Sequence, residues 1–243
     1  MNIVICRDYQ DVSDQAAQKI ITLLQTKPNA KLGLATGSSP IGLYDRLVDA
    51  YHRGVISFKD VMTFNLDEYV GIPRSHPQSY FSFMNEHLFK HVDIKTSQIN
   101  IPDNAIEHID QIAFEYNRLL KKNPLDIQVL GIGSNGHIGF NEPGTPLGNE
   151  TFVVTLDEQT RKDNSRFFTS LDEVPRYAIT MGIKNIMRAK ELLLIASGFE
   201  KAEAVNQMIH GEVTSDLPAS ILQLHPSCTV ILDEAAASKL IEK

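Results

Sequence analysis

The sequence predicts one α/β domain built on a mostly parallel, doubly wound β-sheet with helices on both faces. Six short apolar runs are continuous rather than alternating, which is typical of strands covered on both faces. Between them, apolar residues recur at helical spacing, and this β-α-β-α rhythm favours a doubly wound sheet. The length of 243 residues suits a single domain over residues 1–243 with a sizeable core.

The predicted strands are, in chain order, Ile3–Cys6, Leu32–Ala35, Val61–Leu66, Ile127–Gly131, Leu192–Ala196 and Val230–Leu232. Helices are predicted where apolar side chains share one face, around Ala16–Leu24, Tyr44–Tyr51 and Ile112–Leu120. Residues 143–178 are less regular and contain one further strand-like run, Phe152–Leu156. In open α/β sheets, ligands bind beyond the carboxyl ends of the strands, so candidate site residues are sought there.

Composition narrows the possible partners and the compartment. The formal net charge is -7 and there is no run of Lys and Arg, so we expect binding to neither nucleic acid nor membrane. The N-terminal apolar stretch is too short for a signal peptide, and the longest apolar run cannot span a bilayer. We therefore expect a cytoplasmic protein in which Cys6 and Cys228 are buried free thiols.

The second predicted strand runs into Thr36-Gly37-Ser38-Ser39-Pro40. Pro40 suits the first position of a helix, and Ser39 suits its N-cap. Gly37 lets the backbone approach an anion, and a helix N-terminus attracts one. The loop therefore fits a phosphate, although it equally fits a capped turn that binds nothing. It is not a nucleotide-binding P-loop, because no Gly-Lys-Ser/Thr follows.

The third predicted strand ends in Asp67-Glu68-Tyr69. Two carboxylates at the mouth of a buried strand favour a general base. The alternative is a purely structural use, as a helix cap or in an ion pair.

The fourth predicted strand runs into a glycine-rich segment, Gly131–Pro143. Its first three glycines match the spacing of a dinucleotide fingerprint, but Gly139 and Pro143 follow in place of a long helix. We therefore expect a small substrate near this backbone rather than a dinucleotide. His137 and Glu142 form a candidate proton-transfer pair, and no metal-binding spacing is present.

Five stretches of the chain resemble motifs of the glucosamine-6-phosphate deaminase family. They are Thr36–Pro40, Phe64–Tyr69, Gly133–Pro143, Asn164–Phe168 and Leu222–Pro226. The resemblance runs nearly end to end. It implies a Rossmann-like fold and conversion of glucosamine 6-phosphate and water to fructose 6-phosphate and ammonia in amino-sugar catabolism, without a cofactor or metal.

The same resemblance implies roles for single residues. Asp67 matches the base that moves a proton from C2 to C1, and His137, with Glu142 as its carboxylate partner, matches the ring-opening residue. Residues 146–177 or so match a lid over the active site. The implied phosphate-site residues are Thr36, Gly37, Ser38, Ser39, Arg166 and Lys201.

Two departures from the family pattern carry expectations. Asn135 stands where many members have Asp, so Glu142 alone should supply charge and His137 should be a weaker base. Phe152 and Val154 stand where allosterically activated hexameric members have basic residues. We therefore expect hyperbolic kinetics without activation by N-acetylglucosamine 6-phosphate, and a monomer or small homo-oligomer.

Three alternative functions remain at the level of sequence. A 6-phosphogluconolactonase is similar in fold and in both glycine loops, but it needs no base at C2. A non-catalytic sugar-phosphate sensor would tolerate loss of Asp67 and His137, which are both present. Galactosamine 6-phosphate differs from the expected substrate at a single hydroxyl and stays open as well.

Overall fold

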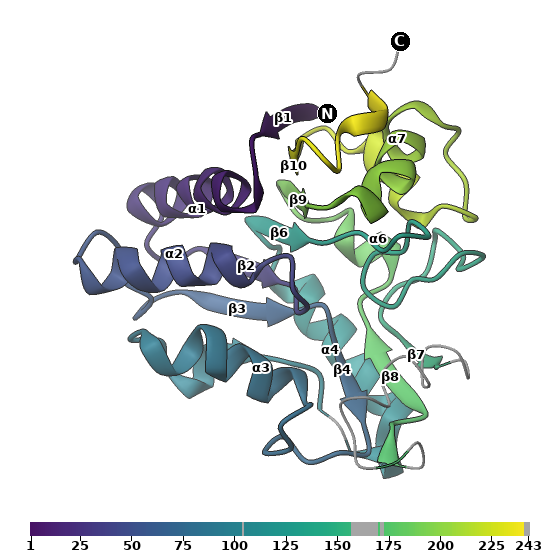
Figure 1. The fold of residues 1–243 in the computed structure, drawn as a ribbon. Helices are drawn as coiled ribbons and strands as arrows, with labels where there is room; N and C mark the ends of the chain where they lie inside the picture. The colour runs from purple at the N-terminus through teal and green to yellow at the C-terminus, as the bar shows by residue number, and fades with distance from the viewer. Residues whose placement is uncertain (104, 157–169, 171–172, 241–243) are drawn as a thin grey trace.

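A seven-stranded sheet, parallel throughout, forms the centre of the computed structural model, which describes residues 1–103, 105–156, 170 and 173–240 (Figure 1). Its strands in spatial order are β1 (Asn2–Cys6), β10 (Cys228–Asp233), β9 (Leu192–Ala196), β6 (Ile127–Leu130), β2 (Lys31–Leu34), β3 (Met62–Asn65) and β5 (Ile99–Asn100). All six strands predicted from apolar runs are present, so the predicted fold class is confirmed. The edge strand β5 was not predicted, because two residues are too short to show a pattern.

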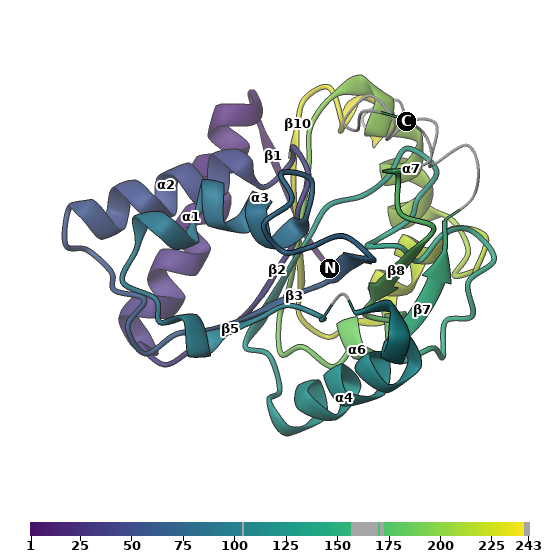
Figure 2. The same cartoon turned by 90° about the horizontal axis from the view of Figure 1, so that it is seen from below.

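Helices cover both faces of this sheet, as Figure 2 shows in a view along the layers. On one face lie α1 (Tyr9–Thr26), α2 (Ile41–His52) and α3 (Tyr80–His87). On the other lie α4 (Ile109–Lys122), α6 (Ile183–Ile186) and α7 (Ala202–His210). Short 3-10 helices occupy Phe89–His91, Thr96–Gln98, Ile106–His108, Phe199–Lys201, Pro218–Leu224 and Ser238–Leu240.

Helix α1 shows how the sequence pattern becomes a packed element. The Asp8 side chain accepts a hydrogen bond from the Asp11 N–H at 2.9 Å and so caps the first turn. Val12, Ala16 and Ile20 then fall on one face of the helix and are buried against the sheet.

A second, smaller sheet is antiparallel and consists of β4 (Asp67–Val70), β8 (Tyr177–Thr180) and β7 (Phe152–Thr155), in that order. The strand-like run at Phe152 is therefore confirmed as β7. Asp67–Tyr69 was expected to be loop at a strand mouth, and this is wrong: these residues belong to β4. Their pairing partners in β8 follow more than a hundred residues later, beyond the reach of a local pattern.

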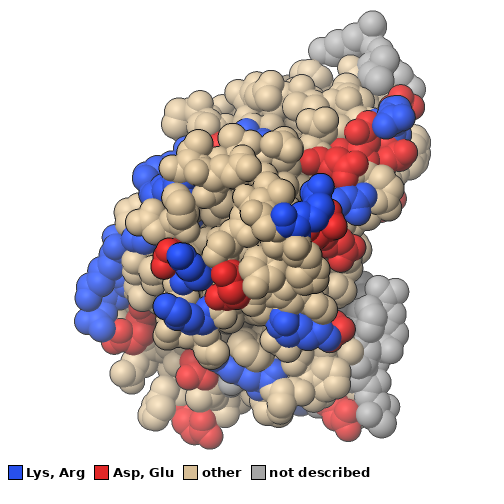
Figure 3. Space-filling view, turned by 90° about the vertical axis from the view of Figure 1, so that its left-hand side faces the viewer, with Lys and Arg blue, Asp and Glu red and all other residues tan. Residues whose placement is uncertain are grey.

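No helix among the described residues is both long and apolar enough to cross a membrane. Cys6 and Cys228 are buried and unpaired, as predicted. On the face around α1 and α2, Lys and Arg lie interspersed with Asp and Glu (Figure 3), and Arg46 of α2 pairs with Asp14 of α1.

The chain just before β7 is fixed by Glu150. Its carboxylate accepts a hydrogen bond from Asn117 Nδ2 at 2.6 Å and pairs with Lys121 at 2.7 Å and with Arg188 at 3.1 Å. The hydrogen bond from Lys121, followed by that from Asn117, lowers the pKa of Glu150 to about 2. Segments from α4, α6 and the approach to β7 are thereby joined at one point.

Gly182 makes this junction possible. A Cβ at residue 182 would lie 2.2 Å from the Asn149 carbonyl oxygen and 2.3 Å from the Glu150 carbonyl oxygen, so only glycine fits. We predict that Gly182→Ala lowers the free energy of unfolding by about 1–3 kcal/mol in urea titrations. Gly148→Ala is the matched control, because a Cβ there meets no atom within 4 Å. Equal stability of the two variants would contradict the prediction.

Candidate active site

Three loops that the sequence singled out lie along one edge of the sheet. They follow β2, β6 and β9, which are neighbouring parallel strands, so the carboxyl ends of all three meet there. The first two loops are in contact: a Cβ on Gly131 would lie 3.7 Å from Ser39 Oγ. The structure thus brings the expected phosphate loop against the glycine-rich segment.

The loop after β2 keeps its hydroxyls available for a ligand. Gly37 has a φ of 92°, in the left-handed region that glycine tolerates. Within the described part of the chain, the side chains of Thr36, Ser38 and Ser39 make no hydrogen bond. These groups and the adjacent backbone can therefore face an anion.

The expected N-cap at Ser39 is wrong, since α2 begins at Ile41 and the N-cap position is Pro40. Tyr9 of α1 instead accepts a hydrogen bond from a backbone N–H group in the first turn of α2, as an N-cap side chain would. The Tyr9 hydroxyl accepts a hydrogen bond from the Gly42 N–H at 2.8 Å and donates one to the Ser38 carbonyl at 3.0 Å. No local pattern in the sequence could show this contact between two helices.

Asp67 lies at the start of β4 and is 6 % exposed. Its carboxylate accepts no hydrogen bond from any residue that the structure describes. Burial, and then the charge of Glu68, raise the pKa of Asp67 to about 8. A Cβ on Gly139 would lie 3.5 Å from Asp67 Oδ2, so this carboxylate faces the segment between His137 and Glu142.

Glu68 points elsewhere and has the structural use that the sequence left open. It is completely buried, and its carboxylate accepts hydrogen bonds from the backbone N–H groups of Tyr69, Tyr80 and Phe81 at 2.8–2.9 Å. Two of these donors form the first turn of α3. The two adjacent carboxylates are therefore divided: Glu68 caps a helix, and Asp67 is left without such a partner.

The glycine-rich segment folds His137 back over its own backbone. The Gly133 N–H donates to the His137 carbonyl at 2.9 Å, and a Cβ on Gly133 would lie 2.4 Å from the imidazole Cε1. Gly136, with a φ of 84°, makes the turn between them. Glycine at 133 is thus required for the imidazole to lie where it does.

Asn135, His137 and Glu142 meet in this loop. Asn135 Nδ2 donates to Glu142 Oε2 at 2.8 Å, and the His137 backbone N–H donates to Asn135 Oδ1 at 3.2 Å. His137 Nδ1 lies 3.2 Å from Glu142 Oε1, close enough for an ion pair but not aligned as a hydrogen bond. A small turn of the imidazole would align the two groups, as catalytic pairs often do when substrate binds.

Two polar side chains that the sequence did not single out fix this loop to β8. Thr180, the cross-strand partner of Asp67, accepts a hydrogen bond from the Phe140 N–H at 3.2 Å. Asn141 Nδ2 donates to the Ile138 and Met181 carbonyls, both at 2.9 Å. The loop that carries His137 is thereby held against the strand pair that carries Asp67.

The cationic candidates are only partly placed. Lys201 is half-buried and ends the 3-10 helix that leads into α7. Asp233 fixes the start of this loop, because its two carboxylate oxygens accept from the Gly198 N–H at 3.1 and 3.0 Å. Arg166 lies outside the described residues. His225, from the fifth family-like motif, bonds the Ala189 carbonyl and has a structural role.

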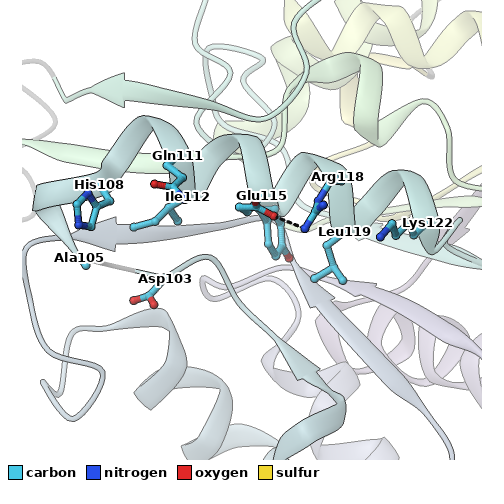
Figure 4. A pocket seen from close by; sticks show the side chains of 10 residues that line it. Asp103, Ala105, His108, Gln111, Ile112, Glu115, Arg118, Leu119 and Lys122 are labelled. Carbon is cyan, nitrogen blue, oxygen red and sulfur yellow. Dashed lines mark ion pairs between the residues drawn. The ribbon is translucent and has the colours of Figure 1, made fainter.

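Among the described residues, no group of three His, Cys, Asp or Glu side chains could hold a metal ion. A groove of about 530 Å³ runs along α4, where Glu115 and Arg118 pair with each other (Figure 4). None of the predicted site residues that the structure describes lines it, so the strand ends remain the candidate site.

Comparisons with known proteins identify a family to which this chain is similar. The model of the family described as glucosamine-6-phosphate isomerases/6-phosphogluconolactonase matches residues 8–231. A glucosamine-6-phosphate deaminase of Thermoanaerobacter pseudethanolicus is 47 % identical over 239 residues, which are 98 % of this chain and 94 % of that protein. One of Clostridium botulinum is 49 % identical over 244 residues, covering 100 % and 98 %.

Two solved structures have a fold similar to that of this chain. A monomeric glucosamine-6-phosphate deaminase superposes with a TM-score of 0.93 at 44 % identity, over 98 % of this chain and all of that one. A 6-phosphogluconolactonase of Trypanosoma cruzi superposes with a TM-score of 0.80 at 19 % identity, over 99 % and 97 % of the two chains. At that low identity, the second likeness shows the fold alone.

The raised pKa of Asp67 makes stability depend on pH. Between pH 3.8 and about 8 the unfolded chain has lost this proton while the folded chain keeps it, so stability falls as pH rises. Asn has no ionisable proton, so the stability of Asp67→Asn does not fall with pH for this reason. Its stability advantage over wild type in urea unfolding should therefore grow by about 2 kcal/mol or more between pH 5 and pH 8. The exposed Asp45→Asn is the control; an advantage that does not grow with pH would refute the burial argument.

Proposed function

This chain belongs to the glucosamine-6-phosphate isomerase/6-phosphogluconolactonase family, and we propose that it converts glucosamine 6-phosphate and water to fructose 6-phosphate and ammonia. One observation carries the choice within the family. The buried carboxylate of Asp67, which has no hydrogen-bond partner among the described residues, faces the loop of His137 and Glu142. An aldose–ketose isomerisation needs a base at carbon, whereas lactone hydrolysis does not.

His137 and Glu142 suit the opening of the sugar ring, which moves a proton from the anomeric hydroxyl to the ring oxygen. The imidazole can take the first proton and return it to the second atom. Glu142 lies beside the imidazole to stabilise its cationic form, and Asn135 holds Glu142 by a hydrogen bond. These three side chains act as one unit in the proposed mechanism.

Asp67 suits the next step, transfer of the C2 proton to C1. Removal of that proton from C2 of the open aldehyde, with a proton passing from the substrate's ammonium group to O1, gives an enolamine. Return of the first proton to C1 then gives a protonated imine at C2. Water adds to the imine, ammonia leaves, and the ketose remains. A carboxylate whose pKa is raised to about 8 is a stronger base, once ionised, than an ordinary one, which suits abstraction from carbon.

The phosphate group fits the loop of Thr36, Gly37, Ser38 and Ser39, with Lys201 and Arg166 as its cations. In this proposal residues 146–177, of which 157–169 and 171–172 lie outside the described residues, form a lid of the single domain. Within the described part, β7 pairs with β8, and β8 pairs with the strand of Asp67. The proposed chemistry requires no metal and no organic cofactor. We place the enzyme in the cytoplasm, as a monomer or small homo-oligomer; the likeness to a monomeric deaminase supports the latter.

The deciding experiment supplies glucosamine 6-phosphate to metal-free protein without added NAD or pyridoxal phosphate. Ammonia and fructose 6-phosphate should appear in equal amounts. Asp67→Asn should lose about 10²–10⁴-fold in kcat, while the exposed Asp45→Asn should keep wild-type activity. If the protein released no ammonia from glucosamine 6-phosphate but hydrolysed 6-phosphogluconolactone in a parallel assay, it would be a lactonase instead. Turnover by Asp67→Asn near the wild-type rate would show that Asp67 is not the base.

Asn135→Asp tests the role of the neutral amide. Asn135 donates to Glu142, so an acid at this position places two carboxylates together beside the imidazole. Two carboxylates in contact hold a proton more tightly than a single one does, because ionisation of both would place two negative charges side by side. The acid limb of the pH profile of kcat/KM should therefore lie at higher pH in this variant. Identical acid limbs in the variant and wild type would contradict the prediction.

A further inference from the structure

Glu68 is a buried ionisable group that the proposed mechanism does not use. It follows Asp67 directly in β4, and its side chain has no exposed surface. A neutral residue could fill the space, and burial of a charge carries a large desolvation cost unless the charge is well bonded. The contacts of Glu68 indicate what its charge is for.

Only hydrogen-bond donors face the Glu68 carboxylate among its recorded partners. Oε1 accepts from the N–H groups of Tyr69 and Tyr80, and Oε2 accepts from that of Phe81. None of these groups can accept a proton from a neutral carboxylic acid. Burial raises the pKa of Glu68, and the three backbone hydrogen bonds and the positive charge of Arg74, in the turn between β4 and α3, oppose that rise. The surroundings therefore suit a fixed negative charge.

Burial is the first cause of the raised pKa of Asp67, and the charge of Glu68 is the second. Among the described residues, the other titratable side chains that interact with Asp67 are Tyr69 in β4, Tyr80 in α3 and Tyr116 in α4. His137 and Glu142 lie in the loop that the Asp67 carboxylate faces. Burial raises the pKa of each tyrosine above its ordinary value, so all three stay neutral at physiological pH. Glu68 is thus the charged neighbour that opposes ionisation of Asp67.

We propose that Glu68 is a positioning residue whose carboxylate, fixed on the N-terminus of α3, raises the proton affinity of the adjacent base Asp67. Its effect on catalysis rests on the proposed function, but its effect on Asp67 does not. Without the charge, Asp67 ionises at lower pH and becomes a weaker base towards carbon. The same anchor holds Tyr80, whose ring stacks on Phe140 with the planes 6° apart, beneath the loop that carries His137.

The test compares Glu68→Gln with Ser79→Ala. Ser79 is the N-cap of α3 and accepts from the Ser82 N–H at 3.0 Å, so its loss weakens the same helix terminus without changing charge. Titration of the Asp67 side-chain carboxyl carbon, followed by ¹³C NMR and assigned with Asp67→Asn, reports directly on the base. Its midpoint should fall by about one pH unit or more in Glu68→Gln and stay unchanged in Ser79→Ala.

An unchanged midpoint in Glu68→Gln, or equal shifts in the two variants, would reduce Glu68 to a helix cap and overturn the proposal. If Glu68→Gln does not fold, the wild-type titration still decides: Glu68 must ionise at lower pH than Asp67, and the opposite order overturns the proposal. These readouts need no turnover, so they stand even if the deaminase assay fails.

Kinetics supply the second readout. In Glu68→Gln the acid limb of kcat/KM should move to lower pH and the alkaline plateau of kcat should fall, with KM changed less than about twofold. Ser79→Ala should keep the wild-type pH profile. A loss of kcat without movement of the acid limb would contradict the proposed role.

Discussion

Leu66 is the one residue that separates β3 of the parallel sheet from β4 of the antiparallel sheet along the chain. The candidate site depends on how the backbone of Leu66 is held. Its N–H donates to the Leu34 carbonyl of β2 at 3.1 Å, and its carbonyl accepts from the Met181 N–H, just beyond β8, at 2.7 Å. One peptide unit is thereby bonded into the parallel sheet and the next into the antiparallel sheet. Asp67 follows directly and has no freedom to move away from the sheet edge.

Because successive residues of a strand point to opposite faces, this junction separates the two acids that follow it. Asp67 faces the loop of His137, whereas Glu68 reaches the first turn of α3. Both carboxylates are buried, but among the residues that the structure describes only Glu68 has backbone donors to compensate. The fold thus keeps one carboxylate poorly solvated, which lowers stability at neutral pH and makes that carboxylate a stronger base.

Close backbone approach is the second requirement of the site. Gly133 leaves room for the His137 ring, and Gly139 leaves room between Thr180 and Asp67. A side chain at either position would separate groups that, in the proposed mechanism, act on neighbouring atoms of one small molecule. Gly133 and Gly139 therefore allow protein groups to approach each other closely, and of the two only Gly133 belongs to the spacing that resembles a dinucleotide fingerprint.

The sequence by itself determined the parallel sheet, the helices α1, α2 and α4 and the candidate residues Asp67, His137 and Glu142, because these rest on local periodicity and on position after a strand. It could not determine that Asp67 begins a strand, that Glu68 caps α3, or that Tyr9 bonds the start of α2. Each of these depends on a partner 12 to more than 100 residues away. Burial of Asp67, and with it the proton affinity that suits a base, was decided only when those distant segments packed around it.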